Sequence, residues 1–225
     1  MTTPETDPTP ADRWTVWRID DTGNTFVVRQ RLAHEDALRL VAEFEARGHK
    51  QMYWAERERA PTVTPNIRLA TSDDLAAIRE IFNHYVATST CTFQLDPDTA
   101  EDTAAWFAGR GPAHPVIVAE MDGVVAGWAA LSAWKARCAY AKSAEASVYV
   151  RHDAHRRGIG RALLADLIAR GRAAGLHTII GGACTEHPAS LALQEALGFV
   201  RMACFREVGH KFGRWLDVAY MQLML

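Results

Sequence analysis

The segment between residues 146 and 174 constrains the fold of this chain more than any other. Residues 146–150 predict a strand, residues 152–160 a turn that carries Gly158 and Gly160, and residues 159–174 a helix with one apolar face. Glycine lets the backbone approach a ligand closely, and the first N–H groups of a helix have no intrahelical acceptor, so a pyrophosphate can accept from them. The same pattern also fits a plain tight turn before a helix.

Local charge distinguishes this turn from the rest of the chain. The 225 residues carry a formal net charge of −2, yet Arg156, Arg157 and Arg161 gather at the turn. A dinucleotide-binding fold would require a third glycine where this chain has Leu163. That alternative is therefore disfavoured.

The composition is typical of a globular protein, with 48% hydrophobic and 23% charged residues. The small net charge gives no argument for nucleic acid or an anionic membrane as a partner. No apolar run approaches the roughly 18 residues that a spanning helix requires, and the first ten residues are acidic and rich in Pro and Thr, unlike a signal peptide. We expect a cytoplasmic protein that binds neither nucleic acid nor membranes.

The spacing of cysteine and histidine predicts no metal site. The four cysteines are widely scattered, without a CxxC pair or a histidine at ligand spacing, and reduced thiols are expected. His152 and His155 are three residues apart, but both fall in the predicted turn.

Four segments are predicted along the chain. Residues 1–12 lack the apolar content to order themselves and are expected to be a disordered tail. Residues 13–58 predict a β-β-α-β module, whose role stays open between packing or dimerisation and ligand sensing. Residues 59–65 have the proline content of a linker, and residues 66–225 form the main domain.

Strands and helices alternate in the main domain. A strand at residues 67–70 precedes helices at residues 71–85 and 100–108. Residues 116–121 and 124–132 are strands joined by Asp122-Gly123, a strong hairpin signal that predicts an antiparallel meander. The expected fold class is α/β (α+β), with a mixed central sheet flanked by helices.

Two motifs resemble the GNAT family of N-acetyltransferases. Residues 155–160, His-Arg-Arg-Gly-Ile-Gly, resemble the family's Q/R-x-x-G-x-G/A turn, with His155 in the position usually held by Gln or Arg. Residues 190–199, which end in Leu-Gly-Phe, resemble its final helix and the exit into a strand. The resemblance implies a GNAT fold and acetyl-CoA as co-substrate, with the pyrophosphate bound by backbone N–H groups.

Further segments are similar to the phosphinothricin and methionine sulfoximine or sulfone acetyltransferases of this family. These segments are residues 83–85, 92–93, 134–140, 144–150 and 209–218. The similarity covers residues 66–225 and leaves out the first 60. It implies an enzyme that acetylates the α-amino group of a small amino acid or analogue, and a homodimer.

Glu145 is the candidate general base. It opens an apolar strand, where partial burial would raise its pKa and suit it to accept a proton from an amine, directly or through water. An exposed charge at a strand end is the alternative. The donor of a proton to the leaving thiolate stays open, because the last helix has no tyrosine.

The resemblance also implies the residues that bind acetyl-CoA. They come from the strand after Glu145, whose backbone would bind the pantetheine arm, from the glycine turn and from the last helix. The set is Val148, Tyr149, Val150, Arg156, Arg157, Gly158, Ile159, Gly160, Arg161, His187 and Ser190.

Arg137 is the candidate for binding the carboxylate of the acceptor, since a guanidinium binds a carboxylate through two parallel hydrogen bonds. Lys135 lies in the same loop, and Phe93 and Tyr140 are candidate pocket walls. A solvated surface role is the alternative for Arg137.

Two positions depart from the resembled enzymes. His187 replaces an asparagine that contacts CoA, and Gln194 replaces a histidine. Both can still form hydrogen bonds, so CoA binding is expected to persist, while acceptor choice or a proton-transfer step can differ. Two other functions stay open: a GNAT enzyme for a polyamine, an antibiotic or a protein N-terminus, and a degenerate domain that senses CoA or an amino acid. The presence of Glu145 and the glycine turn argues against the sensor.

Overall fold

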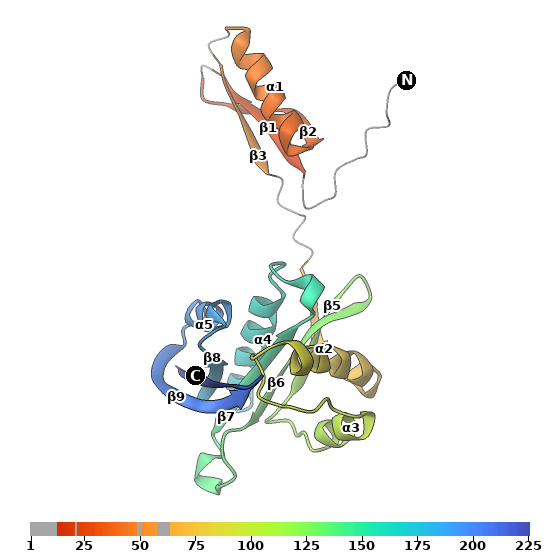
Figure 1. The fold of residues 1–225 in the computed structure, drawn as a ribbon, viewed down its shortest axis with the longest axis vertical. Coiled ribbons are helices and arrows are strands. Elements are labelled where there is room, and N and C mark those ends of the chain that lie inside the picture. Colours follow the sequence, from red (N-terminus) through yellow and green to blue (C-terminus); the bar gives the residue numbers. More distant parts are fainter. Residues whose placement is uncertain (1–12, 21, 49–50, 58–63) are drawn as a thin grey trace. The chain divides into compact units, whose positions relative to one another are not determined.

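The computed structural model describes residues 13–20, 22–48, 51–57 and 64–225, and the chain divides into two compact units, Met1–Thr62 and Val63–Leu225 (Figure 1). A three-stranded sheet belongs to the first unit and a seven-stranded sheet to the second. The predicted tail at residues 1–12 and most of the predicted linker at residues 59–65 lie outside the described residues.

The first unit has the β-β-α-β order that the sequence predicts. Its elements are β1 (Trp14–Ile19), β2 (Thr25–Leu32), α1 (His34–Ala46) and β3 (Met52–Arg57). β1 pairs antiparallel with both other strands. On the face that carries α1, Tyr53 stacks on Phe44 with ring centroids 4.9 Å apart. On the opposite face, Trp17 and Trp54 are cross-strand partners whose centroids lie 6.5 Å apart.

The second unit is a mixed sheet with helices on both faces. Its elements are β4 (Asn66–Leu69), α2 (Leu75–Thr88), α3 (Ala100–Ala108), β5 (Val116–Met121), β6 (Val124–Ala133), β7 (Ser143–Val150), α4 (Ile159–Ala173), β8 (Thr178–Cys184), α5 (Pro188–Glu195), β9 (Val200–Lys211) and β10 (Arg214–Met224). The strand order is β4-β5-β6-β7-β8-β10-β9, and only β7 and β8 are parallel. The predicted fold class is confirmed.

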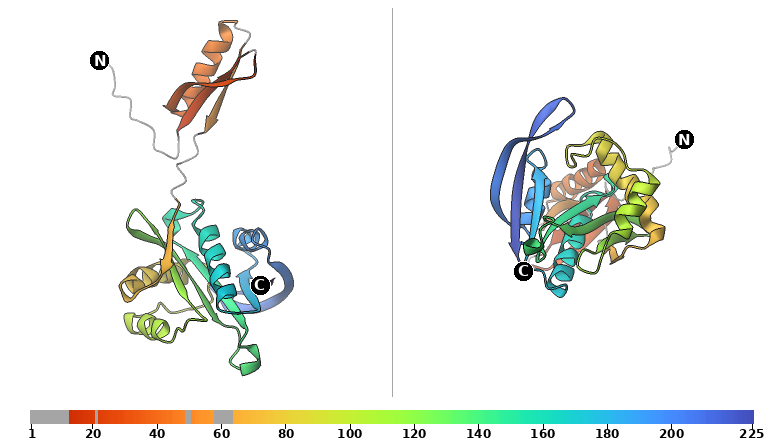
Figure 2. Two further views of the ribbon diagram at one scale, coloured as in Figure 1. Left: turned by 180° about the vertical axis from the view of Figure 1, so that it is seen from behind. Right: turned by 90° about the horizontal axis from the view of Figure 1, so that it is seen from below.

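Two apolar clusters explain how the helices cover this sheet (Figure 2). Leu163 and Leu167 of α4 pack with Ile117 of β5 in one cluster. Ile78 of α2 packs with Val118 of β5 in the other. Because successive residues of a strand point to opposite faces, α4 covers one face of the sheet and α2 and α3 cover the other.

Local sequence signals set several element boundaries. Asp122 and Gly123 have φ angles of 53° and 78°, the left-handed geometry of a two-residue hairpin turn, and they join β5 to β6 as predicted. Thr99 caps α3, since its hydroxyl accepts a hydrogen bond from the backbone N–H of Asp102.

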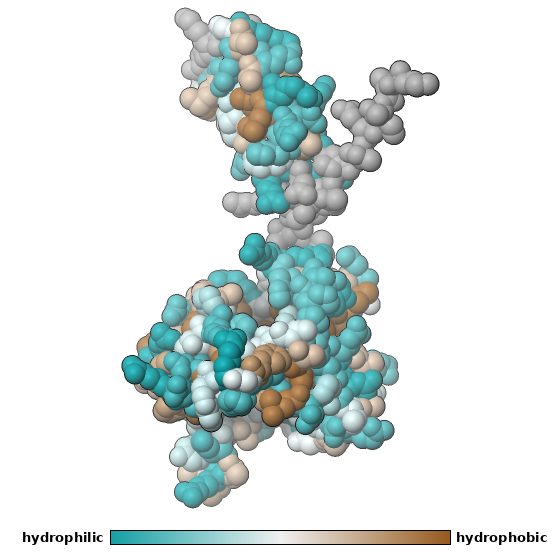
Figure 3. Space-filling model, in the orientation of Figure 1, coloured by the Kyte–Doolittle hydropathy of each residue, from teal (hydrophilic) through white to brown (hydrophobic). Residues whose placement is uncertain are grey.

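The surface of the second unit is mostly hydrophilic on the face drawn in Figure 3, with a few apolar patches. Within the described ranges, no helix is both long and apolar enough to cross a membrane. The same ranges hold no cluster of three or more His, Cys, Asp or Glu side chains suited to a metal ion.

The parallel pair β7 and β8 separates after three residues. Ser143–Glu145 pair with Thr178–Ile180, and beyond these positions no ladder joins the two strands. Each strand then continues along its other neighbour, β7 beside β6 and β8 beside β10. An opening therefore lies in the middle of the sheet and begins at Glu145.

Candidate active site

A cleft occupies the opening between β7 and β8. Its walls are residues 145–149 of β7, residues 182–184 of β8, the loop at residues 90–93, side chains of β9 and β10, and one side of α5. The predicted residues Phe93, Glu145, Val148, Tyr149, His187 and Ser190 all line it. We call this feature the cleft.

Glu145 lies at the point where the strands separate. Burial raises the pKa of its carboxyl group, and the positive charge of Lys135 lowers it in part. A Cβ atom on Gly182 would lie 3.6 Å from Glu145 Oε1 and 3.3 Å from a ring carbon of Tyr220. The absence of a side chain at Gly182 therefore leaves space beside the carboxylate.

The glycine turn follows β7 directly. Arg156 and Gly158 have φ angles of 61° and 79°, and Gly158 is the N-cap of α4 with no side-chain hydrogen bond to the helix end. The first N–H groups of α4 are therefore left without an intrahelical acceptor. Arg157 and Arg161 are exposed beside them, as is Arg156.

Gly160 packs closely under the turn. A Cβ atom there would lie 3.3 Å from Leu193 Cδ2 and 3.6 Å from Val150 Cγ2, so any side chain at this position would require the Leu193 side chain to shift by a few tenths of an ångström. Ile159 beside it is buried and anchors the start of α4 in the core.

His155, which stands where the resembled turn motif usually has Gln or Arg, contacts α2. Its Nε2 lies 2.7 Å from Tyr85 Oη, and the Tyr85 phenol donates to the carbonyl of Val150 at 2.5 Å. Burial raises the pKa of Tyr85 to about 12, so the phenol keeps its proton at neutral pH. Because that proton goes to Val150, Nε2 of His155 must be the donor to Oη.

α5 and its N-cap bring His187 and Gln194, the two residues that differ from the resembled enzymes, to the cleft. His187 Nε2 lies 3.0 Å from Thr90 Oγ1, and burial lowers the pKa of His187 against the opposing charge of Glu186. The imidazole is therefore neutral at pH 7. Gln194 is 7% exposed, and its Oε1 has no hydrogen-bond partner in the described part of the chain.

Lys211 of β9 fixes the loop that covers the cleft. Its side chain is 2% exposed, and Nζ donates to the carbonyls of Ser89 at 2.9 Å and Thr92 at 2.8 Å. Burial lowers the pKa of Lys211. The ring of Phe93 then lies against Gly209, where a Cβ atom would come within 2.0 Å of it.

The predicted acceptor residues are not all brought together. Phe93 lines the cleft, and Lys135 stands 5.0 Å over the Trp134 ring while its charge reaches Glu145. Arg137 and Tyr140 are exposed on the loop between β6 and β7 and line neither the cleft nor the second pocket described next.

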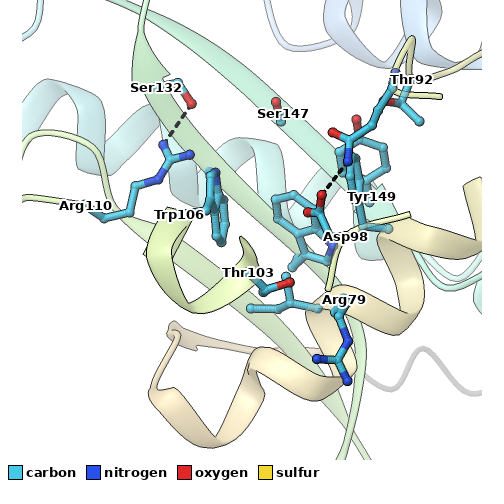
Figure 4. A pocket seen from close by; sticks show the side chains of 14 residues that line it. Arg79, Thr92, Asp98, Thr103, Trp106, Arg110, Ser132, Ser147 and Tyr149 are labelled. Atoms are coloured by element: carbon cyan, nitrogen blue, oxygen red, sulfur yellow. Dashed lines mark hydrogen bonds between the residues drawn. The ribbon is translucent and has the colours of Figure 1, made fainter. Parts of the chain in front are cut away.

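A second pocket, which we call the side pocket, lies between the sheet and helices α2 and α3 (Figure 4). Aromatic side chains wall it, among them Trp106 and Tyr149. Thr92, Ser147 and Tyr149 line both this pocket and the cleft, so the two spaces adjoin. Arg110 follows α3 and lines the side pocket beside β6.

Sequence reasoning missed Arg110, Ser132, Lys211 and Tyr220. Ser132 and Trp128 are four positions apart in a predicted strand, and this even spacing could have placed both on one face of the sheet. No local pattern marks the others, because each reaches the site through strand pairing or a long-range hydrogen bond.

The chain matches the family described as "Acetyltransferase (GNAT) domain" over residues 67–220. It is 42% identical to an L-amino acid N-acyltransferase of Escherichia coli over 161 residues, which cover 71% of this chain and 94% of that protein. It is 40% identical to the L-methionine sulfoximine/L-methionine sulfone acetyltransferase of Salmonella typhimurium over 161 residues, covering 71% of this chain and 94% of that protein.

A solved structure agrees with these sequence relatives. A phosphinothricin acetyltransferase of Sinorhizobium meliloti in complex with acetyl-CoA superposes with a TM-score of 0.71 at 37% identity, covering 72% of this chain and 89% of the other. The resemblance found in the motifs is thus confirmed over most of the second unit. The chain belongs to the GNAT acetyltransferase family.

Proposed function

We propose that this protein transfers an acetyl group from acetyl-CoA to the α-amino group of a small amino acid or analogue, with Glu145 as general base. The position of Glu145 carries the proposal. It is a half-buried carboxylate of raised pKa at the point where β7 and β8 separate, and it faces open space. A base of this kind holds its proton more tightly than a solvated carboxylate and is suited to deprotonate an ammonium group.

Acetyl-CoA is proposed to lie between the glycine turn and the cleft. The N–H groups at Gly158–Gly160 bind the pyrophosphate, and Arg156, Arg157 and Arg161 add positive charge. The backbone of Val148–Val150 binds the pantetheine arm, and His187 and Ser190 contact the cofactor from α5. The S. meliloti relative, solved with acetyl-CoA, supports this cofactor.

The proposed reaction is a direct attack. Glu145 accepts a proton from the acceptor's ammonium group, directly or through water. The neutral nitrogen attacks the thioester carbonyl and a C–N bond forms. The C–S bond then breaks, and the CoA thiolate leaves and takes up the second proton, which the attacking nitrogen loses as the amide forms. N–H groups of the β7 backbone that face the thioester oxygen would stabilise its developing charge.

The proposed acceptor class follows the relatives, whose names state action on L-amino acids and on methionine sulfoximine or sulfone. The acceptor residues expected from the sequence are Phe93, Tyr140, Lys135 and Arg137, and of these Phe93 lines the cleft. The resemblance also proposes a homodimer, and the sequence a cytoplasmic protein whose catalytic domain is residues 66–225.

The test is acetyl-CoA-dependent release of free thiol across a panel of amino acids, sulfoximines, polyamines and peptides. We expect turnover with amino acids, and a loss of about 100-fold or more in kcat for Glu145→Gln. Glu80→Gln, which changes an exposed glutamate of α2, is the matched control and should retain full activity. Undiminished activity of Glu145→Gln would remove Glu145 as the base, and CoA binding without any turnover would favour a sensor.

A further inference from the structure

Arg110 is a half-buried guanidinium at one end of the side pocket. Its NH1 group donates to the carbonyl of Leu131 and to the hydroxyl of Ser132, each at 2.8 Å. The guanidinium also stacks over the ring of Trp106, with Cζ 4.3 Å from the centroid. These contacts hold the plane of the guanidinium in one orientation against β6.

The charge of Arg110 has no carboxylate partner among the residues that the structure describes, and burial alone lowers its pKa. Its Nε and NH2 nitrogens make no hydrogen bond to any described residue. Arg68 of the same unit shows the contrast, since its guanidinium bonds Asp74 at 2.7 and 2.9 Å. Half-buried charges normally have a counter-charge, and none of the described residues provides one for Arg110, so its guanidinium is suited to bind the anionic group of a ligand.

The sheet places Arg110 close to Glu145. Ser132, which accepts from Arg110, is the direct cross-strand partner of Glu145. Such partners point to the same face with Cβ atoms about 4.5–5.5 Å apart. In Figure 4 the guanidinium of Arg110 and the hydroxyls of Ser132 and Ser147 lie toward one end of the pocket, and Ser147 also lines the cleft.

We propose that Arg110 binds the carboxylate of the acceptor amino acid and so directs its α-amino group toward Glu145. The inference rests on the proposed acetyl transfer to amino acids. The two unused nitrogens, Nε and NH2, form the edge of the guanidinium that matches a carboxylate in a bidentate pair. An α-amino acid carries its amine and its carboxylate on one carbon. A carboxylate held beside Ser132 therefore keeps the amine near Glu145, the cross-strand partner of Ser132.

The placement favours Arg110 over the other arginines near the site. Arg137 is exposed on the loop between β6 and β7 and lines neither pocket. Arg79 lines the side pocket from α2, and Figure 4 shows its guanidinium directed away from Ser132 and Ser147. Arg79 is therefore the matched control for a positive charge in the same pocket.

The experiment compares L-methionine sulfone with its α-carboxamide, which lacks the anionic carboxylate, in initial-rate assays. For Arg110→Gln we expect the KM for the acid to rise about 10- to 100-fold, as for a lost charge-assisted hydrogen bond, and the KM values for the carboxamide and for acetyl-CoA to stay unchanged. Arg79→Met should leave the acid-to-carboxamide ratio as in the wild type. Each variant is assayed on both acceptors, so their different amine pKa values cancel.

A purely structural role of Arg110 would change both acceptors equally, and that outcome overturns the proposal, as does an unchanged KM for the acid. If Arg110→Gln does not fold, Arg110→Lys replaces it, because lysine keeps the charge and loses the bidentate geometry. If the wild type acetylates neither acceptor, the proposed acetyl transfer is wrong, but the role of Arg110 can still be tested by binding. L-Methionine sulfone is then titrated into CoA-saturated protein by calorimetry. We expect weaker binding by the Arg110 variant, and equal affinity would contradict the assignment.

Discussion

Tyr85 Oη of α2 lies 2.7 Å from Nε2 of His155 at the start of the glycine turn. The two residues are 70 positions apart, and their rings are stacked with centroids 6.3 Å apart. The same phenol donates to the carbonyl of Val150, the last residue of β7. One side chain thus fixes both the end of the strand and the beginning of the turn. The proposed cofactor site requires these two segments in a fixed position relative to each other.

Tyr85→Phe is expected to weaken acetyl-CoA binding. The change removes one hydroxyl and both of its hydrogen bonds, so that His155 keeps only its 3.3 Å contact with the carbonyl of Val150 and the turn becomes less ordered. Since a neutral hydrogen bond contributes about 0.5–1.5 kcal/mol, the Kd for acetyl-CoA measured by calorimetry should rise about 2- to 10-fold. Thr88→Val, which removes an exposed hydroxyl from the same helix, should leave the Kd unchanged. An unchanged Kd in Tyr85→Phe would show that the turn is ordered without this contact.

Lys135→Met is expected to move the acid limb of the pH profile to higher pH. Burial raises the pKa of Glu145 and the Lys135 charge lowers it, so removing that charge lets the pKa rise further. A base acts only when deprotonated, and kcat/KM should therefore decline at a higher pH in the variant than in the wild type, while the alkaline plateau stays similar. Lys142→Met removes an exposed lysine near the start of β7 and should not move the limb. A limb that stays in place for Lys135→Met would mean that a group other than Glu145 is titrating.

Asp74→Asn is expected to destabilise the second unit at neutral pH. The Arg68 guanidinium, together with the N–H of Thr71, holds the pKa of the buried Asp74 below its usual 3.8. A depressed pKa stabilises the fold above the unfolded value, and this contribution is lost as pH falls below 3.8. Because Arg68 is partly exposed, the loss at pH 7 should be about 1–2 kcal/mol.

Urea denaturation at pH 7 and at pH 3 measures this effect. The difference between wild type and Asp74→Asn should be largest at pH 7 and should shrink in acid. Asp73→Asn, at the exposed neighbouring position, is the control and should show no such pH dependence. A difference that is constant over this range would assign the effect to packing rather than to the charge of Asp74.

The sequence predicts those parts of the fold whose causes are local. Residues 100–108 form a helix with the predicted bounds because Thr99 and Asp102 cap it, and Asp122-Gly123 form the predicted hairpin. The glycine turn is equally local, since a strand, two glycines and an apolar helix follow one another directly. Each of these features is decided by residues within a few positions of one another.

The acceptor side of the site depends on distant contacts, which local sequence patterns do not predict. Arg137 is the sequence candidate for the carboxylate because it lies eight residues before Glu145, yet it is exposed on a loop. Arg110 is far from Glu145 along the chain and approaches it only because β6 and β7 pair Ser132 with Glu145. Lys211 reaches Ser89 across 122 positions. Such proximity follows from strand register, which no local pattern states.

Gly181→Ala is expected to destabilise the protein through Gln194. A Cβ atom on Gly181 would lie 2.0 Å from Gln194 Oε1 and 2.8 Å from its Cδ, so the Gln194 amide, in a residue that is 7% exposed, would have to move from its position. Overpacking of this kind costs about 1–3 kcal/mol, measured as the free energy of unfolding in urea. Gln194→Ala removes the obstructing amide, so the double variant should be more stable than the sum of the two single effects predicts. Additive effects would show that the amide is not the atom group that excludes a side chain at position 181. Gly160→Ala is the control, because a Cβ atom there meets Leu193 rather than Gln194 and should show no coupling to Gln194→Ala.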